Sequence, residues 1–165
     1  MSAVILKTLG GVRDVVKAGA AVLVSGAFDP LHYGHIRYLR AAAQHAGTHG
    51  MPLVVAVAPD EYVQRRHPLL QRLEERMEMI DAIQGVAFVI PQESESLAET
   101  IRRIHPRYVV KGTDWRAHGL PEAELAAVKE VGAELVWTEV SPDVSSSDLL
   151  HAAFWRFADE WVGRT

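Results

Sequence analysis

The chain has 165 residues, with 17 Lys and Arg, 21 Asp and Glu, no Cys and a formal net charge of −4. This length is enough for one domain with a buried core. The absence of cysteine excludes disulfide frameworks, cysteine zinc sites and thiol catalysis. The slightly acidic balance argues against a broad basic face for duplex nucleic acid, so small anionic ligands are better candidates than polymers.

Signals for targeting or membrane insertion are not found in the sequence. The N-terminal segment has no charged start followed by a long apolar core, and no stretch holds about 18 uncharged apolar residues. We therefore expect a soluble cytoplasmic protein without a membrane partner. We find no repeat or linker, which favours a single domain over residues 1–165.

Short apolar runs alternate with segments of helical periodicity. The runs suit strands that are buried on both faces and cover residues 21–25, 53–58, 86–90, 108–111 and 134–137. Apolar spacing predicts helices over 5–18, 34–46, 71–84, 95–104 and 121–131, and a last helix that starts at 145–148. This alternation predicts an α/β fold: one Rossmann-like domain with a five-stranded parallel sheet and helices on both faces.

The last predicted helix is rich in large apolar side chains, namely Leu149, Leu150, Phe154, Trp155, Phe157 and Trp161. Such a face is more typical of core packing or of a subunit contact than of a platform on which bases stack. It contributes to our expectation of a homodimer.

The stretch from Gly26 to His35 (G-A-F-D-P-L-H-Y-G-H) joins the first predicted strand to a helix. A helix that begins at the end of a strand points its free N–H groups at the space beyond that strand and makes an anion site. His32 and His35 lie three residues apart and can both donate to such an anion, and Gly34 allows a ligand to approach closely. An ordinary turn with two capping histidines is the alternative, but the strand before and the amphipathic segment after favour the anion site.

Two further polar loops follow predicted strands: Lys111-Gly112-Thr113-Asp114 and Ser145-Ser146-Ser147. Ligands of open α/β sheets bind beyond the carboxyl ends of the strands, so these loops and the Gly26–His35 stretch should converge on one rim.

The Gly26–His35 stretch matches every fixed position of the G-x-F-D-x-x-H-x-G-H signature of the nucleotidyltransferase superfamily of cytidylyltransferases and related adenylyltransferases. The resemblance continues in order through Glu75-Arg76, the V-K-G-T-D-W run at 110–115 and Val144-Ser145-Ser146-Ser147. Within the superfamily, the chain most resembles the nucleotidyltransferase module of ADP-heptose synthase, and next glycerol-3-phosphate cytidylyltransferase.

The resemblance implies a reaction in which an acceptor phosphate attacks the α-phosphorus of an NTP and releases pyrophosphate. A phosphate monoester, whose second pKa is about 6, needs no strong base. The resemblance makes His32 and His35 donors to the α-phosphoryl oxygens and places Arg76 at the β- and γ-phosphates. It implies nucleotide contacts for eleven further residues: Gly26, Ala27, Phe28, Asp29, Gly34, Lys111, Gly112, Asp114, Ser145, Ser146 and Ser147.

Three assignments stay open at this level. Mg²⁺ is expected to bind mainly through phosphate oxygens, with Asp29 as the candidate protein ligand, although Asp29 suits a turn or helix-cap role equally well. Either Arg65 or Arg66 could close over the triphosphate or the acceptor phosphate. A zinc site at His32 and His35 is disfavoured, because no third ligand beyond Asp29 lies nearby in the sequence.

The run Thr138–Val144 contains no arginine, whereas the glycerol branch carries R-T-E-G-x-S-T-T at this place. This departure favours the heptose-type branch, and so ATP with a phosphorylated sugar such as a heptose 1-phosphate, whose phosphate a separate kinase would supply. The alternative is a CTP-dependent cytidylyltransferase acting on glycerol 3-phosphate or another polyol or alcohol phosphate. A non-catalytic nucleotide-binding module is disfavoured, because both histidines and the basic residues are retained.

Overall fold

The computed structural model describes residues 4–6, 9–139 and 145–162. Its strands are β1 (Val4–Ile5), β2 (Val22–Gly26), β3 (Leu53–Val57), β4 (Phe88–Pro91), β5 (Tyr108–Gly112) and β6 (Glu134–Thr138). Its helices are α1 (Leu9–Val15), α2 (Tyr33–Thr48), α3 (Asp60–Gln64), α4 (Leu73–Asp81), α5 (Ala98–Ile104), α6 (Asp114–His118), α7 (Glu122–Val131) and α8 (Ser146–Val162).

All strands of the sheet are parallel, in the order β1-β4-β3-β2-β5-β6. The predicted α/β fold is confirmed, but the sheet has six strands instead of five. The extra strand β1 pairs Val4 with Phe88 and Ile5 with Val89 at the edge. A strand of two residues shows no alternation that a sequence pattern could reveal, so the pattern places residue 5 in a helix.

Both faces of the sheet are buried. Along the strands, Leu23 and Val54 face the core layer under α1, α5 and α7, whereas Val22 and Val55 face the layer under α2 and α4. Every residue of β3 is buried. This two-sided burial explains why the strands read as continuous apolar runs.

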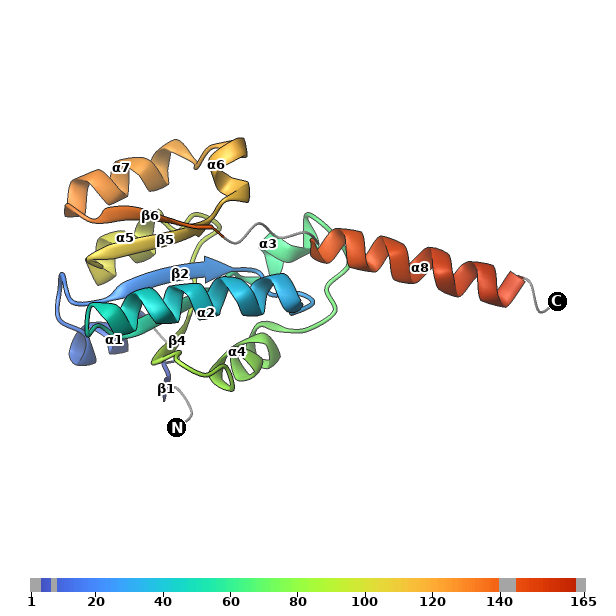
Figure 1. Ribbon diagram of the computed structural model, residues 1–165, viewed down its shortest axis with the longest axis horizontal. Coiled ribbons are helices and arrows are strands. Elements are labelled where there is room, and N and C mark those ends of the chain that lie inside the picture. Colours follow the sequence, from blue (N-terminus) through green and yellow to red (C-terminus); the bar gives the residue numbers. More distant parts are fainter. Residues whose placement is uncertain (1–3, 7–8, 140–144, 163–165) are drawn as a thin grey trace.

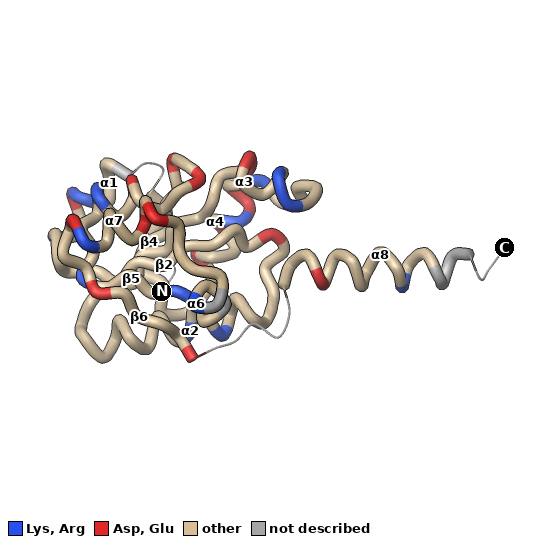
Figure 2. The backbone as a smooth tube through the Cα atoms, turned by 90° about the horizontal axis from the view of Figure 1, so that it is seen from above, with Lys and Arg blue, Asp and Glu red and all other residues tan. Residues whose placement is uncertain are grey.

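The chain runs outward from β2 in both directions, through β3 and β4 on one side and through β5 and β6 on the other (Figure 1). A switch of this kind opens a crevice at the carboxyl ends of the central strands. Basic and acidic residues are interspersed along the described chain (Figure 2). Within the part of the chain that the structure describes, no helix is long and apolar enough to cross a membrane.

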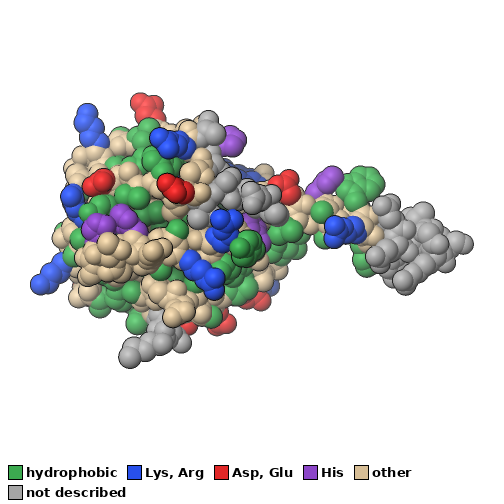
Figure 3. Space-filling view, in the orientation of Figure 1, with side chains coloured by type: hydrophobic (Ala, Val, Ile, Leu, Met, Phe, Trp, Pro, Cys, Tyr) green, Lys and Arg blue, Asp and Glu red, His purple; other side chains and the backbone are tan. Residues whose placement is uncertain are grey.

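Helix α8 extends away from the body (Figure 1). At its base, the Ser146 hydroxyl donates to the carbonyl oxygen of Pro30 at 3.1 Å. Phe154, Trp155 and Phe157 are exposed on the projecting part, and hydrophobic side chains are visible on it in Figure 3.

Candidate functional site

A pocket of about 340 Å³ lies at the carboxyl ends of β2, β3 and β5. Most of the residues predicted from sequence line it: Gly26, Ala27, Phe28, Asp29, His32, Gly34, His35, Arg66, Lys111, Gly112, Ser145, Ser146 and Ser147. Arg65 and Arg76 do not line it. Asp114 begins α6, but its side chain lies outside the described residues, as does all of Val144.

His32 and His35 stack against each other at the start of α2, with ring centroids 3.8 Å apart and an interplanar angle of 26°. His32 is the N-cap of this helix, and its Nδ1 accepts a hydrogen bond from the backbone N–H of Gly34 at 3.1 Å. This bond assigns the proton of the neutral ring to Nε2. The capping role therefore leaves one ring N–H of His32 for a ligand.

Both histidines are held in the neutral form. Burial lowers the pKa of His32. Burial, and secondarily the neighbouring His32, lowers the pKa of His35 to about 3. At neutral pH the pair thus offers neutral N–H donors, which can hydrogen-bond an oxyanion without taking up a proton.

The depressed pKa of His35 predicts acid sensitivity of the fold. The unfolded chain protonates His35 below its ordinary pKa of about 6.5, whereas the folded chain does so only near pH 3, so stability is lost as the pH falls between these values. Between pH 7 and pH 5 this linkage amounts to about 2 kcal/mol. Urea titrations at both pH values should show a smaller difference for His35→Gln than for wild type; equal differences would contradict the assignment.

Phe28 supports this pair from below. Its fully buried ring contacts His35 edge-on, with centroids 5.1 Å apart, and its backbone lies in the left-handed region with φ 56°. A Cβ on Gly26 would lie 2.6 Å from the Phe28 ring, so only glycine fits there. Although both residues line the pocket, their packing explains why the signature needs them.

The buried carboxylate of Asp29 accepts hydrogen bonds from backbone N–H groups. One of its oxygens accepts the N–H of Leu70 and the other that of Gln71, each at 3.0 Å. Asp29 therefore ties the loop before α4 to the signature stretch. Of the two roles left open by the sequence, this geometry favours the structural one.

Arg76 lies beneath the pocket with its side chain fully buried. Its guanidinium donates to the carbonyl oxygens of Ala27 and Ala58, at 2.6 and 2.8 Å, and to that of Gln71, at 3.1 Å. It also forms an ion pair with Asp60 at 2.5 Å. The structure thus places Arg76 differently from the phosphate contact expected from sequence: it holds together the loops that follow β2 and β3.

The structure separates the two candidate arginines. Arg65 forms an ion pair with Glu95 at 2.6 Å. Arg66 lines the pocket, where its guanidinium lies 3.7 Å from the centre of the Tyr62 ring and donates to the Tyr62 carbonyl. No carboxylate of the described residues pairs with Arg66, so its charge is available to an anionic ligand.

Lys111 is the buried cation at the end of β5. Its Nζ donates to Glu124 at 2.9 Å and to the Ser25 hydroxyl at 3.3 Å, and lies 5.5 Å from the centre of the Trp115 ring. The other Glu124 oxygen accepts the N–H of Leu97. Sequence reasoning missed Glu124, because a glutamate in the first turn of a helix is an ordinary surface residue unless the fold covers it.

The three serines lie at the start of α8, beside the signature stretch. Ser145 forms a reciprocal cap with Asp148, in which its hydroxyl lies 2.6 Å from a carboxylate oxygen. This cap lowers the pKa of Asp148. Among the described residues, no group of three or more His, Cys, Asp or Glu side chains could hold a metal ion.

The chain is similar to known proteins in sequence and in fold. A family model described as cytidylyltransferase-like matches residues 23–152. The chain belongs to this family. The superfamily assignment predicted from the signature stretch is confirmed, and with it the class of enzyme, nucleotidyltransferase.

Relatives include proteins named bifunctional protein HldE, one from Hydrogenovibrio crunogenus (37% identity over 125 residues) and one from Desulfatibacillum aliphaticivorans (34% over 133). The matches cover 73% and 78% of this chain but only 23% and 26% of those proteins, so the chain spans about a quarter of their length. The fold matches a lipopolysaccharide core biosynthesis protein from Thermoplasma volcanium, with a TM-score of 0.61, 24% identity and coverage of 74% of this chain and 98% of that one.

Proposed function

We propose that the protein joins an NTP, preferably ATP, to a phosphorylated sugar such as a heptose 1-phosphate. A phosphate oxygen of the sugar attacks the α-phosphorus, the bond between the α-phosphorus and the bridging oxygen to the β-phosphate breaks, and pyrophosphate leaves. The observation that carries this proposal is the stacked pair of neutral histidines at the N-terminus of α2, above the end of β2.

Each part of the site has a defined task in this reaction. The reacting α-phosphoryl group lies at the start of α2, where His32 and His35 donate to its oxygens and stabilise the charge that builds up in the transition state. The Ser147 hydroxyl and the first N–H groups of α8 hold the other phosphates of the nucleotide, since the hydroxyls of Ser145 and Ser146 are bonded to Asp148 and Pro30. The Lys111 ammonium, which Glu124 and Ser25 hold in place at the end of β5, provides a further N–H donor to the nucleotide.

Magnesium would neutralise part of the repulsion between the two phosphorylated reactants. We assign Asp29 the structural role, because both of its carboxylate oxygens accept backbone N–H groups. Magnesium therefore enters the proposal only as the counter-ion of the NTP, coordinated by phosphate oxygens.

Two observations support the sugar phosphate and ATP. The relatives named HldE share 31–37% identity with this chain, and the arginine of the glycerol branch is absent from residues 138–144. The alternative substrate pair is CTP with glycerol 3-phosphate or another alcohol phosphate.

The proposal is tested by pyrophosphate release. The purified protein is incubated with each of the four NTPs and with a panel of sugar 1-phosphates, glycerol 3-phosphate and ethanolamine phosphate. We expect release with ATP and a sugar 1-phosphate. Release only with CTP and an alcohol phosphate would select the alternative, and bound nucleotide without release under any condition would contradict both.

The two neighbouring arginines form a matched pair of variants. Arg66→Ala removes the pocket cation and should lower kcat/KM about 10- to 100-fold, which corresponds to one hydrogen-bonded charge contact. The double variant Arg65→Ala, Glu95→Ala removes the neighbouring arginine together with its partner, which lines the pocket, and should stay within about threefold of wild type. Equal losses in the two variants would show that Arg66 has no special part in binding.

Helix α8 is the surface that we propose for a homodimer. Leu150, Phe154 and Phe157 recur with spacings of four and three residues, the repeat of a helix that pairs with another helix. The double variant Phe154→Glu, Phe157→Glu should sediment as a monomer, whereas Ala152→Glu on the opposite face should sediment as a dimer like wild type. A monomeric wild-type protein would contradict this part of the proposal.

A further inference from the structure

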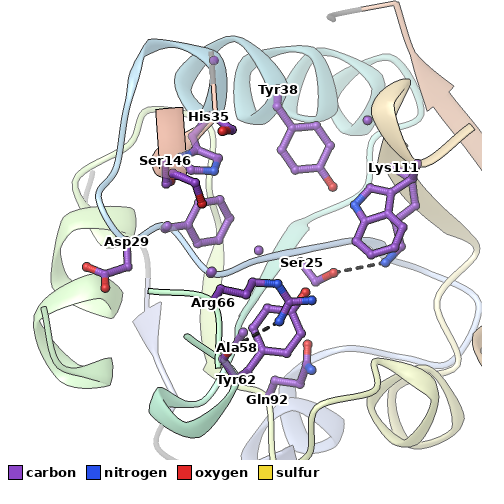
Figure 4. A pocket seen from close by; sticks show the side chains of 18 of the residues that line it. Ser25, Asp29, His35, Tyr38, Ala58, Tyr62, Arg66, Gln92, Lys111 and Ser146 are labelled. Carbon is purple, nitrogen blue, oxygen red and sulfur yellow. Dashed lines mark hydrogen bonds between the residues drawn. The ribbon is translucent and has the colours of Figure 1, made fainter. Parts of the chain in front are cut away.

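The pocket has two halves, one on each side of the end of β2. The half beside β5 contains Lys111 and Trp115, and the proposed function assigns Lys111 to the nucleotide, whereas Ser146 lies on the other side of the pocket, beside Asp29 and His35 (Figure 4). The half beside β3 and β4 contains Arg66, Tyr62 and Gln92. A transfer between two substrates needs both halves, so the second half is the place for the acceptor.

Gln92 offers this half a fixed hydrogen-bond acceptor. It follows β4 directly and is only 5% exposed. Its backbone N–H donates to Val57 at 2.8 Å, and its side-chain Nε2 donates to the carbonyl oxygen of Ser94 at 2.5 Å. These bonds fix the orientation of the amide, and its oxygen points into the pocket, as Figure 4 shows. Among the described residues this oxygen has no partner.

Tyr62 adds a hydroxyl to the same half. Burial raises the pKa of Tyr62, so the phenol stays protonated and can both donate and accept. Its hydroxyl has no hydrogen-bond partner among the described residues, and its ring is covered by the guanidinium of Arg66. The phenol and the Gln92 amide thus form a polar wall next to one cation.

Each carboxylate of the described pocket lining already has an ion-pair or hydrogen-bond partner. Glu95 is paired with Arg65, Glu124 with Lys111, and Asp29 accepts two backbone N–H groups. An ammonium group would therefore find no unpaired carboxylate among the described lining residues. A neutral hydroxyl can donate to the Gln92 amide without this requirement.

We infer that the half of the pocket beside β3 and β4 is an acceptor subsite for phosphate esters of uncharged polyhydroxylated compounds. Arg66 binds the phosphate, and the Gln92 amide oxygen and the Tyr62 hydroxyl bind the hydroxyl groups. This inference rests on the proposed function for the position of the nucleotide. The inference adds the Gln92 amide as the group that selects a sugar phosphate over an amino-alcohol or alkyl phosphate.

The test is equilibrium binding by calorimetry in the presence of a non-hydrolysable ATP analogue. The probes are mannose 1-phosphate, glucose 1-phosphate, heptose 1-phosphate, ethanolamine phosphate and propyl phosphate. At least one sugar phosphate should bind wild type about tenfold tighter than the last two probes, and Gln92→Met should remove this advantage. Propyl phosphate and the ATP analogue should each bind this variant within about twofold of wild type, because neither uses the amide.

Ser94→Ala is the matched control, since it removes only the side-chain bond to Ser96 in the same loop and keeps the carbonyl that orients Gln92. It should bind the sugar phosphate like wild type. The inference is overturned if Gln92→Met weakens all phosphates alike, if it weakens the ATP analogue instead, or if ethanolamine phosphate binds tightest. Selective sugar-phosphate binding without pyrophosphate release would contradict the proposed function and leave the subsite standing. Pyrophosphate release without any preference for hydroxylated phosphates would contradict the subsite and leave the proposed function standing.

Discussion

Replacing His35 by alanine is expected to lower kcat about 100- to 1000-fold, the usual loss when one preorganised donor to a developing oxyanion is removed. The position carries this expectation because the ring lies on the Phe28 edge and against His32, at the start of α2. The KM values should change much less, because the donor acts mainly in the transition state. Steady-state kinetics of pyrophosphate release measures both.

Two further variants in α2 separate an effect on catalysis from an effect on stability. His32→Asn keeps a side-chain acceptor for the Gly34 N–H and removes the Nε2 donor, so it should lose activity with little loss of stability. His45→Ala, near the other end of α2, should keep wild-type kcat. If His32→Asn and His35→Ala both retain wild-type kcat, the histidines serve only to cap and pack the helix.

Arg76→Met is expected to destabilise the fold by about 3 to 5 kcal/mol, the range for breaking a buried, hydrogen-bonded ion pair. The variant leaves Asp60 and the carbonyl oxygens of Ala27 and Ala58 without their shared donor. Chemical denaturation followed by circular dichroism measures this loss. Activity should fall with it, because Ala27 belongs to the loop that carries the histidines.

The control is Arg102→Met, which breaks an exposed pair with Glu130 and should change stability by less than about 1 kcal/mol. An Arg76→Met protein that keeps its stability but loses affinity for nucleotide would restore the phosphate-binding role suggested by the sequence. The structural role and the phosphate-binding role of Arg76 are therefore distinguished by the stability measurement, which does not depend on turnover.

Much of the fold follows from local sequence patterns. Five strands and the longer helices were predicted because their apolar residues repeat with the period of the element, and β3 is buried along its whole length. Strand β1 and the five-residue helices α3 and α6 were missed, since such short segments show no period. The exposure of α8 was also outside the reach of pattern reasoning, because an apolar helix face is the same whether the body or a second chain covers it.

For the candidate site, the sequence by itself determined the Gly26–His35 stretch and its place between a strand and a helix, because those residues are neighbours in the chain. Only the tertiary structure decided which donor meets which acceptor. Arg76 reaches Ala27 across 49 residues, and Lys111 meets Ser25 across 86. The same packing turned Arg66 towards the pocket, paired Arg65 with Glu95 and buried Gln92. Hydrogen bonds and charges act over a few ångströms, so residue types in a sequence show what a side chain can do, and the folded chain decides which partner it has.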